Sequence, residues 1–165
     1  MTIRRFILAL AALVLGAGGC AQDRAPTAPT IRLAVVAGAE HGGAPFATPL
    51  TQEVTTSPVW SGDADGAGDA LVTVNLGQRE ICWEITVTGI ALPATASHIH
   101  KAAPGVRGGI VVPLSAPNGT GAAAGCASDV DRELLQEILT SPASFYVNVH
   151  TSEFPAGAVR GQLDR

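Results

Sequence analysis

Apolar and polar residues alternate along much of the chain after residue 30. The clearest case is residues 81–88, where apolar residues from Ile81 to Val87 alternate with polar ones, as in a strand with one buried face. A Gly-Gln pair at 77–78 precedes this run and predicts a hairpin with the run before it. Apolar or alternating runs predict further strands at residues 31–37, 50–56, 70–76, 97–100, 110–114, 145–151 and 158–163.

One helix is predicted at residues 129–139, because its apolar residues recur at helical spacing. Ser128 is the expected N-cap, with Asp131 three residues on as a weak form of the capping box, and Pro142 follows the end of the helix. Loops rich in Gly, Pro, Asp and Ala are predicted between these elements, at residues 38–49, 61–69, 103–109, 116–126 and 152–157.

Short strands at regular spacing with turn residues between them are typical of an all-β fold. We therefore predict an antiparallel immunoglobulin-like sandwich or barrel, with the one helix in a crossover near residues 129–139. Alternating strand and helix units, as in an α/β enzyme, are not apparent in the pattern.

The first 19 residues have the layout of a secretory signal peptide. Arg4 and Arg5 provide a positive start, residues 6–15 form an apolar run of ten, and small residues follow at 16–19. The apolar run is too short to span a membrane comfortably. We predict that residues 1–19 direct export and are removed.

Cys20 comes directly after Gly18 and Gly19, an order that resembles the lipidation signal of bacterial lipoproteins. Ordinary cleavage nearby, without a lipid, is the alternative. Residues 20–30 are small, polar and rich in proline, as in a flexible tether. The chain thus divides into a signal peptide (1–19), a tether (20–30) and a single β domain (31–165). The lipid on Cys20 would hold that domain at the outer face of the cytoplasmic membrane or at the cell envelope; without it the protein would be secreted.

Two more cysteines, Cys82 and Cys126, remain once Cys20 carries the lipid. A pair of cysteines in an exported chain favours a disulfide, and two unrelated thiols are the alternative. The bridge would close a loop of about 45 residues and stabilise the fold by about 4 kcal/mol in the chain-entropy model.

The composition excludes several classes of protein. The chain is 47% hydrophobic and 15% charged, unlike an intrinsically disordered protein, and its pI of about 5.4 argues against nucleic-acid binding. Removal of residues 1–19 would leave eight basic residues against 14 acidic ones, a net charge of −6. Such a domain is not attracted to anionic lipids, so its contact with the membrane would depend on the lipid at Cys20.

Polar side chains gather on two of the predicted strands. His98 and His100 lie two residues apart and share one face, as do Asn148 and His150 on the other strand. We expect the four side chains to be close together if the strands are neighbours, and His98, His100 and His150 could then bind copper or zinc. A structural polar seam is the alternative. Arg160, on the last strand, is either solvated or an organiser of the same cluster through its five donors.

Other motifs offer no catalytic site. The sequence has no Gly-x-Ser-x-Gly elbow and no phosphate-binding glycine loop before a helix. Asp63, Asp65 and Asp69 lack the spacing of a calcium loop and are interpreted as a turn. His41 has no partner that the sequence identifies. We therefore assign no catalytic residue and expect no enzymatic activity.

Two long segments resemble the signatures of a known family. SHIHKAAPGVRGGIVVPL (97–114) resembles the first signature of the chordin-domain (CHRD) family, and FYVNVHTSEFPAGAVRGQL (145–163) resembles its closing one. The resemblance extends over about residues 46–163. It implies an all-β fold and extracellular display: in animal chordin such domains belong to an extracellular antagonist of growth factors, and in bacteria they occur in exported proteins.

Two hypotheses of function follow. In the first, the protein is a non-enzymatic binding module at the cell envelope, whose partner is an unidentified extracellular or envelope protein or a small ligand, and it has no cofactor. In the second, it is a metalloprotein that holds copper or zinc at His98, His100 and His150. Elemental analysis of the purified protein distinguishes the two.

Overall fold

The computed structural model describes residues 42–56 and 59–164. The predicted signal peptide, Cys20, the predicted tether, the strand expected at 31–37 and His41 all lie outside these residues. The strands are β1 (Ala44–Gln52), β2 (Val54–Thr56), β3 (Val59–Ser61), β4 (Ala67–Asn75), β5 (Glu80–Thr88), β6 (Ala96–Lys101), β7 (Gly109–Leu114), β8 (Ala122–Ala127), β9 (Phe145–His150) and β10 (Val159–Gln162). The helix α1 (Arg132–Thr140) and a 3₁₀ turn, η1 (Pro142–Ser144), connect β8 to β9.

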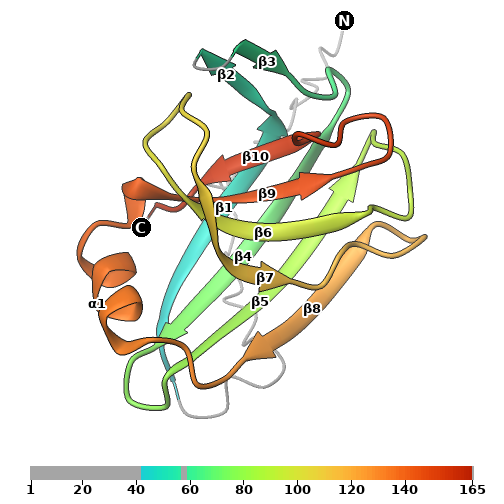
Figure 1. The fold of residues 1–165 in the computed structure, drawn as a ribbon. Coiled ribbons are helices and arrows are strands. Elements are labelled where there is room, and N and C mark those ends of the chain that lie inside the picture. The colour runs from blue at the N-terminus through green and yellow to red at the C-terminus, as the bar shows by residue number, and fades with distance from the viewer. Residues whose placement is uncertain (1–41, 57–58, 165) are drawn as a thin grey trace, which may run out of the picture. The chain divides into compact units, whose positions relative to one another are not determined.

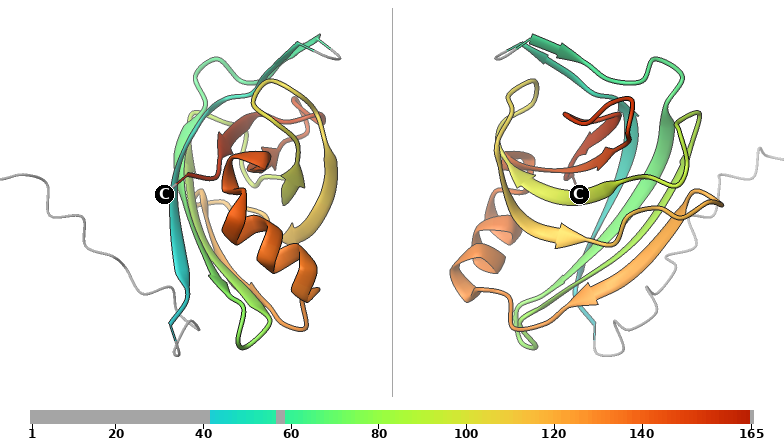
Figure 2. Two further views of the ribbon diagram at one scale, coloured as in Figure 1. Left: turned by 90° about the vertical axis from the view of Figure 1, so that its left-hand side faces the viewer. Right: turned by 45° about the vertical axis from the view of Figure 1, so that its right-hand side comes forward.

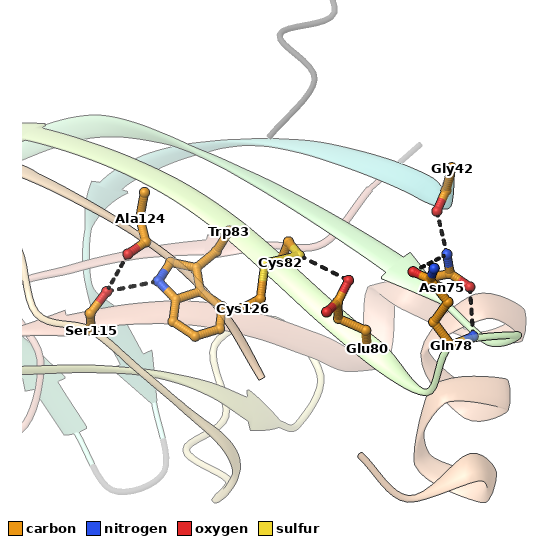
Figure 3. Close-up of a disulfide and its surroundings, with 9 residues drawn as sticks. All are labelled: Gly42, Asn75, Gln78, Glu80, Cys82, Trp83, Ser115, Ala124 and Cys126. Carbon is orange, nitrogen blue, oxygen red and sulfur yellow. Dashed lines mark hydrogen bonds between the residues drawn. A yellow bond between two sulfur atoms is a disulfide. The ribbon is translucent and has the colours of Figure 1, made fainter. Parts of the chain in front are cut away.

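Eight of these strands form one antiparallel sheet in the order β7-β6-β9-β10-β1-β4-β5-β8. The sheet curls into a near-closed barrel, so that its edge strands β7 and β8 approach each other (Figures 1 and 2). Ser115, just after β7, donates to the carbonyl of Ala124 in β8 and accepts a hydrogen bond from the Trp83 indole of β5 (Figure 3). The predicted all-β antiparallel fold with one helix is confirmed, and of the two expected forms the barrel is present.

The core of the barrel consists of the apolar residues that alternate along the strands. Ile85, Ile99, Val147 and Val159 are fully buried and belong to one continuous cluster. The amphipathic helix α1 lies across one end of the barrel and adds Leu135 and Ile138 to this cluster (Figure 2). Burial of such a side chain stabilises the fold by about 1.5–3 kcal/mol.

β1 begins within residues 38–49, which were wrongly predicted to form a loop. Two prolines, Pro45 and Pro49, lie in this strand with exposed side chains and pair with Thr73 and Asp69 of β4. On its other edge, β1 pairs with β10 only at its last two residues. Within the described part of the chain, the rest of that edge therefore needs no backbone N–H to hydrogen-bond to a neighbouring strand. Proline is tolerated at such an edge because it lacks only the backbone N–H.

β8 was also wrongly predicted as a loop, at residues 116–126. Its alanines and glycine carry little strand signal, yet the strand pairs with β5 from Ala122 to Ala127. Gly125 is required there, since a Cβ at this position would lie 2.7 Å from the ring of Trp83. The tertiary neighbour, and not the local sequence, determines this strand.

Other boundaries differ by a few residues. The strand expected at 50–56 is broken at Glu53, where the chain leaves the barrel to form the β2–β3 hairpin. Asp69, assigned to a turn, lies within β4, whereas Asp63 caps the turn before it by accepting from the Asp65 N–H. Asp131, not Ser128, is the N-cap of α1, and its carboxylate accepts from two backbone N–H groups of the first turn.

The structure contains the predicted disulfide between Cys82 and Cys126. The two residues are directly opposite each other in β5 and β8, with Cα atoms 4.0 Å apart (Figure 3). Cys82 lies on the outer face of the barrel, where it packs against Leu71 and remains buried. The bridge therefore fastens the edge strand β8 to the rest of the sheet.

Candidate functional site

A polar face covers the outside of β6, β9 and β10, which are neighbours in the sheet. Ile99, Val147 and Val149 point into the core, so the alternate residues of the same strands point outward. His98 pairs with Asn148 across β6 and β9, and Asn148 pairs with Arg160 across β9 and β10. The outward residues of this face are His98, His100, Tyr146, Asn148, His150, Arg160 and Gln162.

Three histidines converge on this face. One ring nitrogen of each of His98, His100 and His150 lies within 4.8 Å of the other two. His98 Nδ1 and His150 Nε2 are 3.2 Å apart, and the ring centroids of the three histidines are 5.1–5.9 Å apart. The antiparallel pairing of β6 with β9 brings residues 98 and 150 together although 52 positions separate them in the sequence.

Backbone carbonyls orient two of the three rings. His100 Nδ1 donates to the Gly108 carbonyl at 3.0 Å, and His150 Nδ1 donates to the Pro155 carbonyl at 3.2 Å. The Nε2 atoms of both rings are then left with a lone pair. Within the described residues, the buried Nε2 of His100 has no hydrogen-bond partner.

The loop between β6 and β7, residues 102–108, is held against this face by polar side chains. Arg160 donates to the carbonyls of Val106 and Ala103 at 2.8 and 3.0 Å, and Gln162 donates to that of Ala102 at 2.7 Å. Arg160 is only 7% exposed, so it organises the polar cluster and is not a solvated cation. The loop thereby places the Gly108 carbonyl beside His100.

A buried carboxyl group lies at the other side of Asn148. Glu53, fully buried between β1 and β2, is 3.9 Å from the Arg160 guanidinium and lies beside Asn148 and Gly157. Gly157 has φ of +132°, and a Cβ there would overlap the Glu53 carboxyl oxygen. Only glycine fits this position, for its backbone conformation and for space.

A comparison with protein families identifies the chain. The model of the CHRD domain matches residues 46–163, most of the sequence and all three histidines. The chain belongs to the CHRD family. No curated protein and no solved structure matches it.

Burial keeps the histidines of this CHRD domain neutral. It lowers the pKa of His98, of His100 and, together with repulsion from His98, that of His150 to about 4. Neutral imidazole is the form that binds metal ions. Burial also raises the pKa of Glu53, against the opposing effects of Asn148 and Arg160.

Tyr146 and Gln162 of this CHRD domain's polar face, and Glu53 beside that face, were not recognised in the sequence. Tyr146 precedes Asn148 and His150 at the same spacing of two, so strand alternation alone could have placed it on their face. Glu53 gave no such signal, since a single acidic residue within a strand-like run is usually exposed. Only the fold shows that Glu53 is enclosed by β10 and the turn at Gly157.

Proposed function

We propose that this CHRD domain binds one copper or zinc ion through His98, His100 and His150. The observation that carries the proposal is the convergence of three neutral imidazoles with their ring nitrogens within 4.8 Å of one another. The ligands would be Nδ1 of His98 and Nε2 of His100 and His150, because the other nitrogens of His100 and His150 are already bonded to carbonyls.

The distance between His98 and His150 fits such a centre. Metal–nitrogen bonds of about 2.0–2.1 Å in a tetrahedral site place two ligand nitrogens about 3.3 Å apart. His98 Nδ1 and His150 Nε2 are 3.2 Å apart. Histidines that bind metals commonly donate their second N–H to a carbonyl or carboxylate, as His100 and His150 do. A set of nitrogen ligands suits copper and zinc.

A polar cluster with only a structural role explains less of the geometry than a metal site does. Without an ion, the contact between His98 and His150 is an ordinary hydrogen bond, which a structural cluster explains as well. The buried Nε2 of His100, however, has no partner within the described residues, and such a group costs about 1–3 kcal/mol. A bound ion would satisfy it. This difference supports the metalloprotein over the binding module without metal.

Metal analysis tests the proposal. The protein is purified without a histidine tag, exposed in turn to copper and zinc, dialysed, and analysed for metal by mass spectrometry. We expect one ion per chain in the wild type, loss of the ion in His100→Ala and His150→Ala, and full retention in the control His41→Ala. Less than one ion per wild-type chain, or retention of the ion in all variants, would contradict the proposal.

We further propose that the domain is exported and anchored to the cell envelope by a lipid on Cys20. The support is the order of charged, apolar and small residues before Cys20 and the tether after it. Among the described residues, no helix is long and apolar enough to cross a membrane. Two or more acyl chains on Cys20 would give stable attachment.

Membrane fractionation tests this location. Cys20→Ala should move the protein from the detergent phase to the soluble fraction, whereas the neighbouring control Gln22→Ala should stay in the detergent phase. Unchanged partitioning of Cys20→Ala would refute the lipid anchor and would leave the metal proposal untouched.

A further inference from the structure

We infer that Tyr146 is the positioning residue of the histidine site and fixes His100 as an Nε2 ligand. The inference rests on the proposed metal binding and names a residue that does not itself contact the ion. Tyr146 is the one tyrosine of the chain and is 1% exposed, on the outer face of β9 directly opposite His100 of β6.

Tyr146 holds His100 in two ways. Its ring stacks on the imidazole, with centroids 4.9 Å apart and planes within 9° of parallel. Its hydroxyl accepts a hydrogen bond of 3.1 Å from the Gly108 N–H, while the Gly108 carbonyl accepts from His100 Nδ1 at 3.0 Å. Tyr146, Gly108 and His100 thus form a closed triangle in which the tyrosine fixes both the plane of the imidazole and the carbonyl that orients it.

Arg160 fixes Tyr146 from the opposite side. The guanidinium carbon lies 3.3 Å from the centroid of the tyrosine ring, in a cation–π contact. The same guanidinium donates to Val106 and Ala103, which belong to the loop that carries Gly108. The stack of Arg160, Tyr146 and His100 therefore connects the imidazole to the loop through rigid, buried groups.

This arrangement determines which nitrogen of His100 is protonated. A carbonyl at Nδ1 requires the Nδ1–H tautomer, which leaves the lone pair on Nε2, turned toward the other two histidines. His100 would then bind an ion through Nε2 without a change of its tautomer, and such preorganisation raises affinity. Loss of the groups that orient a metal ligand typically lowers metal affinity 10–100-fold.

Two variants separate the roles of the hydroxyl and the ring. Tyr146→Phe keeps the stack and removes the bond to Gly108, and Tyr146→Leu removes both. We expect zinc affinity, measured by competition with a chromophoric chelator, to fall several-fold in the first and 10–100-fold in the second. The control Trp83→Phe removes a hydrogen bond between an aromatic ring and Ser115 outside the histidine cluster and should bind zinc as the wild type does.

The tautomer of His100 is measured independently, by ¹⁵N NMR of its imidazole in metal-free protein. The wild type should show protonated Nδ1 and bare Nε2, and both Tyr146 variants should show a mixture of tautomers. Failure of wild-type protein to bind zinc would refute the metal proposal, and the tautomer would still test the role of Tyr146.

Unchanged zinc affinity together with an unchanged His100 tautomer in the variants would overturn the inference. If Tyr146→Leu does not fold, as judged by circular dichroism, the zinc affinity and the His100 tautomer of Tyr146→Phe alone test the inference.

Discussion

Two sides of the barrel are stabilised in different ways. Where β5 meets β8, the strands are joined by the disulfide, and the outer face holds a small apolar contact between Cys82 and Leu71. Where β6, β9 and β10 meet, the inner face is apolar, but the outer face is a layer of polar side chains covered by the 102–108 loop. The two sides share one core and one sheet.

The difference indicates that the side formed by β6, β9 and β10 has a role besides stability. Buried ion pairs and hydrogen-bonded pairs can often be replaced as a whole by apolar residues of similar shape without loss of stability. The polar side nevertheless keeps His100 Nε2 and Asn148 Oδ1 without hydrogen-bond partners among the described residues, at a cost of about 1–3 kcal/mol each. Natural proteins break the rules of good packing and hydrogen bonding mainly at functional sites. The unsatisfied atoms therefore support a site on this side.

The largest effect is expected from removal of the disulfide. Cys82→Ala/Cys126→Ala should lower the free energy of unfolding by about 4 kcal/mol, because the bridge closes a segment with a sequence separation of 44. Urea denaturation measures the loss. Zinc affinity of the folded variant should stay within about twofold of the wild type, since the cysteines lie outside the polar face. A loss of both stability and affinity would show that the two sides are not independent.

The next largest effect is expected at Gly157. Gly157→Ala should destabilise the fold by about 3 kcal/mol, because a methyl group would overlap the buried carboxyl of Glu53 and crowd Asn148, at a φ that alanine rarely adopts. Gly105→Ala is the matched control: Gly105 also has positive φ, but the atom nearest to its Cβ position, Oγ1 of Thr56, is 4.0 Å away, so the substitution should cost about 1 kcal/mol. Equal effects of the two substitutions would contradict the proposed crowding.

Acid should weaken the polar side specifically. The unfolded chain protonates His150 near its ordinary value of 6.5, whereas the folded chain does so only near pH 4, so the unfolded state binds more protons between these values. Stability of the metal-free protein should therefore be complete above pH 6.5 and fall as the pH drops toward 4. The expected loss is about 1–2 kcal/mol, since one pKa unit corresponds to about 1.4 kcal/mol and solvent screens this half-buried ring.

His150→Gln checks that assignment. Urea denaturation of the chelator-treated protein at several pH values should give a smaller slope for this variant than for the wild type. Equal slopes would mean that the acid sensitivity arises from other groups.

The sequence predicted which side chains share a face of a strand better than it predicted where every strand lies. Alternation placed β5 almost to the residue and put His98, His100, Asn148 and His150 on one face, because side-chain direction follows from strand period alone. It failed at β1 and β8, where prolines, alanines and Gly125 carry no strand signal and the neighbouring strand determines the structure. The same limit applies to the candidate site.

What the sequence could not provide is the contact made through loops. How the 102–108 loop folds back over β9 and β10 determines the position of Gly108. The same fold of the loop determines the stack of Arg160, Tyr146 and His100. Nor does any local pattern distinguish Glu53 from an exposed strand residue. The bond of Arg160 to Ala103 joins residues 57 positions apart, and Glu53 is still farther from Arg160 along the chain, so these two contacts follow from topology and register.

The smallest effect is expected from Glu53→Gln, and it tests how the polar side tolerates its buried carboxyl. Burial raises the pKa of Glu53 above its usual 4.5, so folding favours the protonated form. The stabilisation linked to that proton is fully present below about pH 4.5 and is lost as the pH rises through the folded-state pKa.

Glutamine has nearly the same shape as glutamate and carries no charge that must be neutralised on burial. Arg160 keeps its acceptors on Val106, Ala103 and Gln162 in the variant. We therefore expect Glu53→Gln to match the wild type or exceed it by up to about 1 kcal/mol at pH 7, with the difference disappearing or reversing at pH 4.5. Urea denaturation at both pH values, with the exposed Glu153→Gln as control, measures this. A destabilisation of about 3 kcal/mol or more at pH 7 would instead mean that Arg160 needs the ionised carboxylate at 3.9 Å, and that the polar side is held by a buried ion pair.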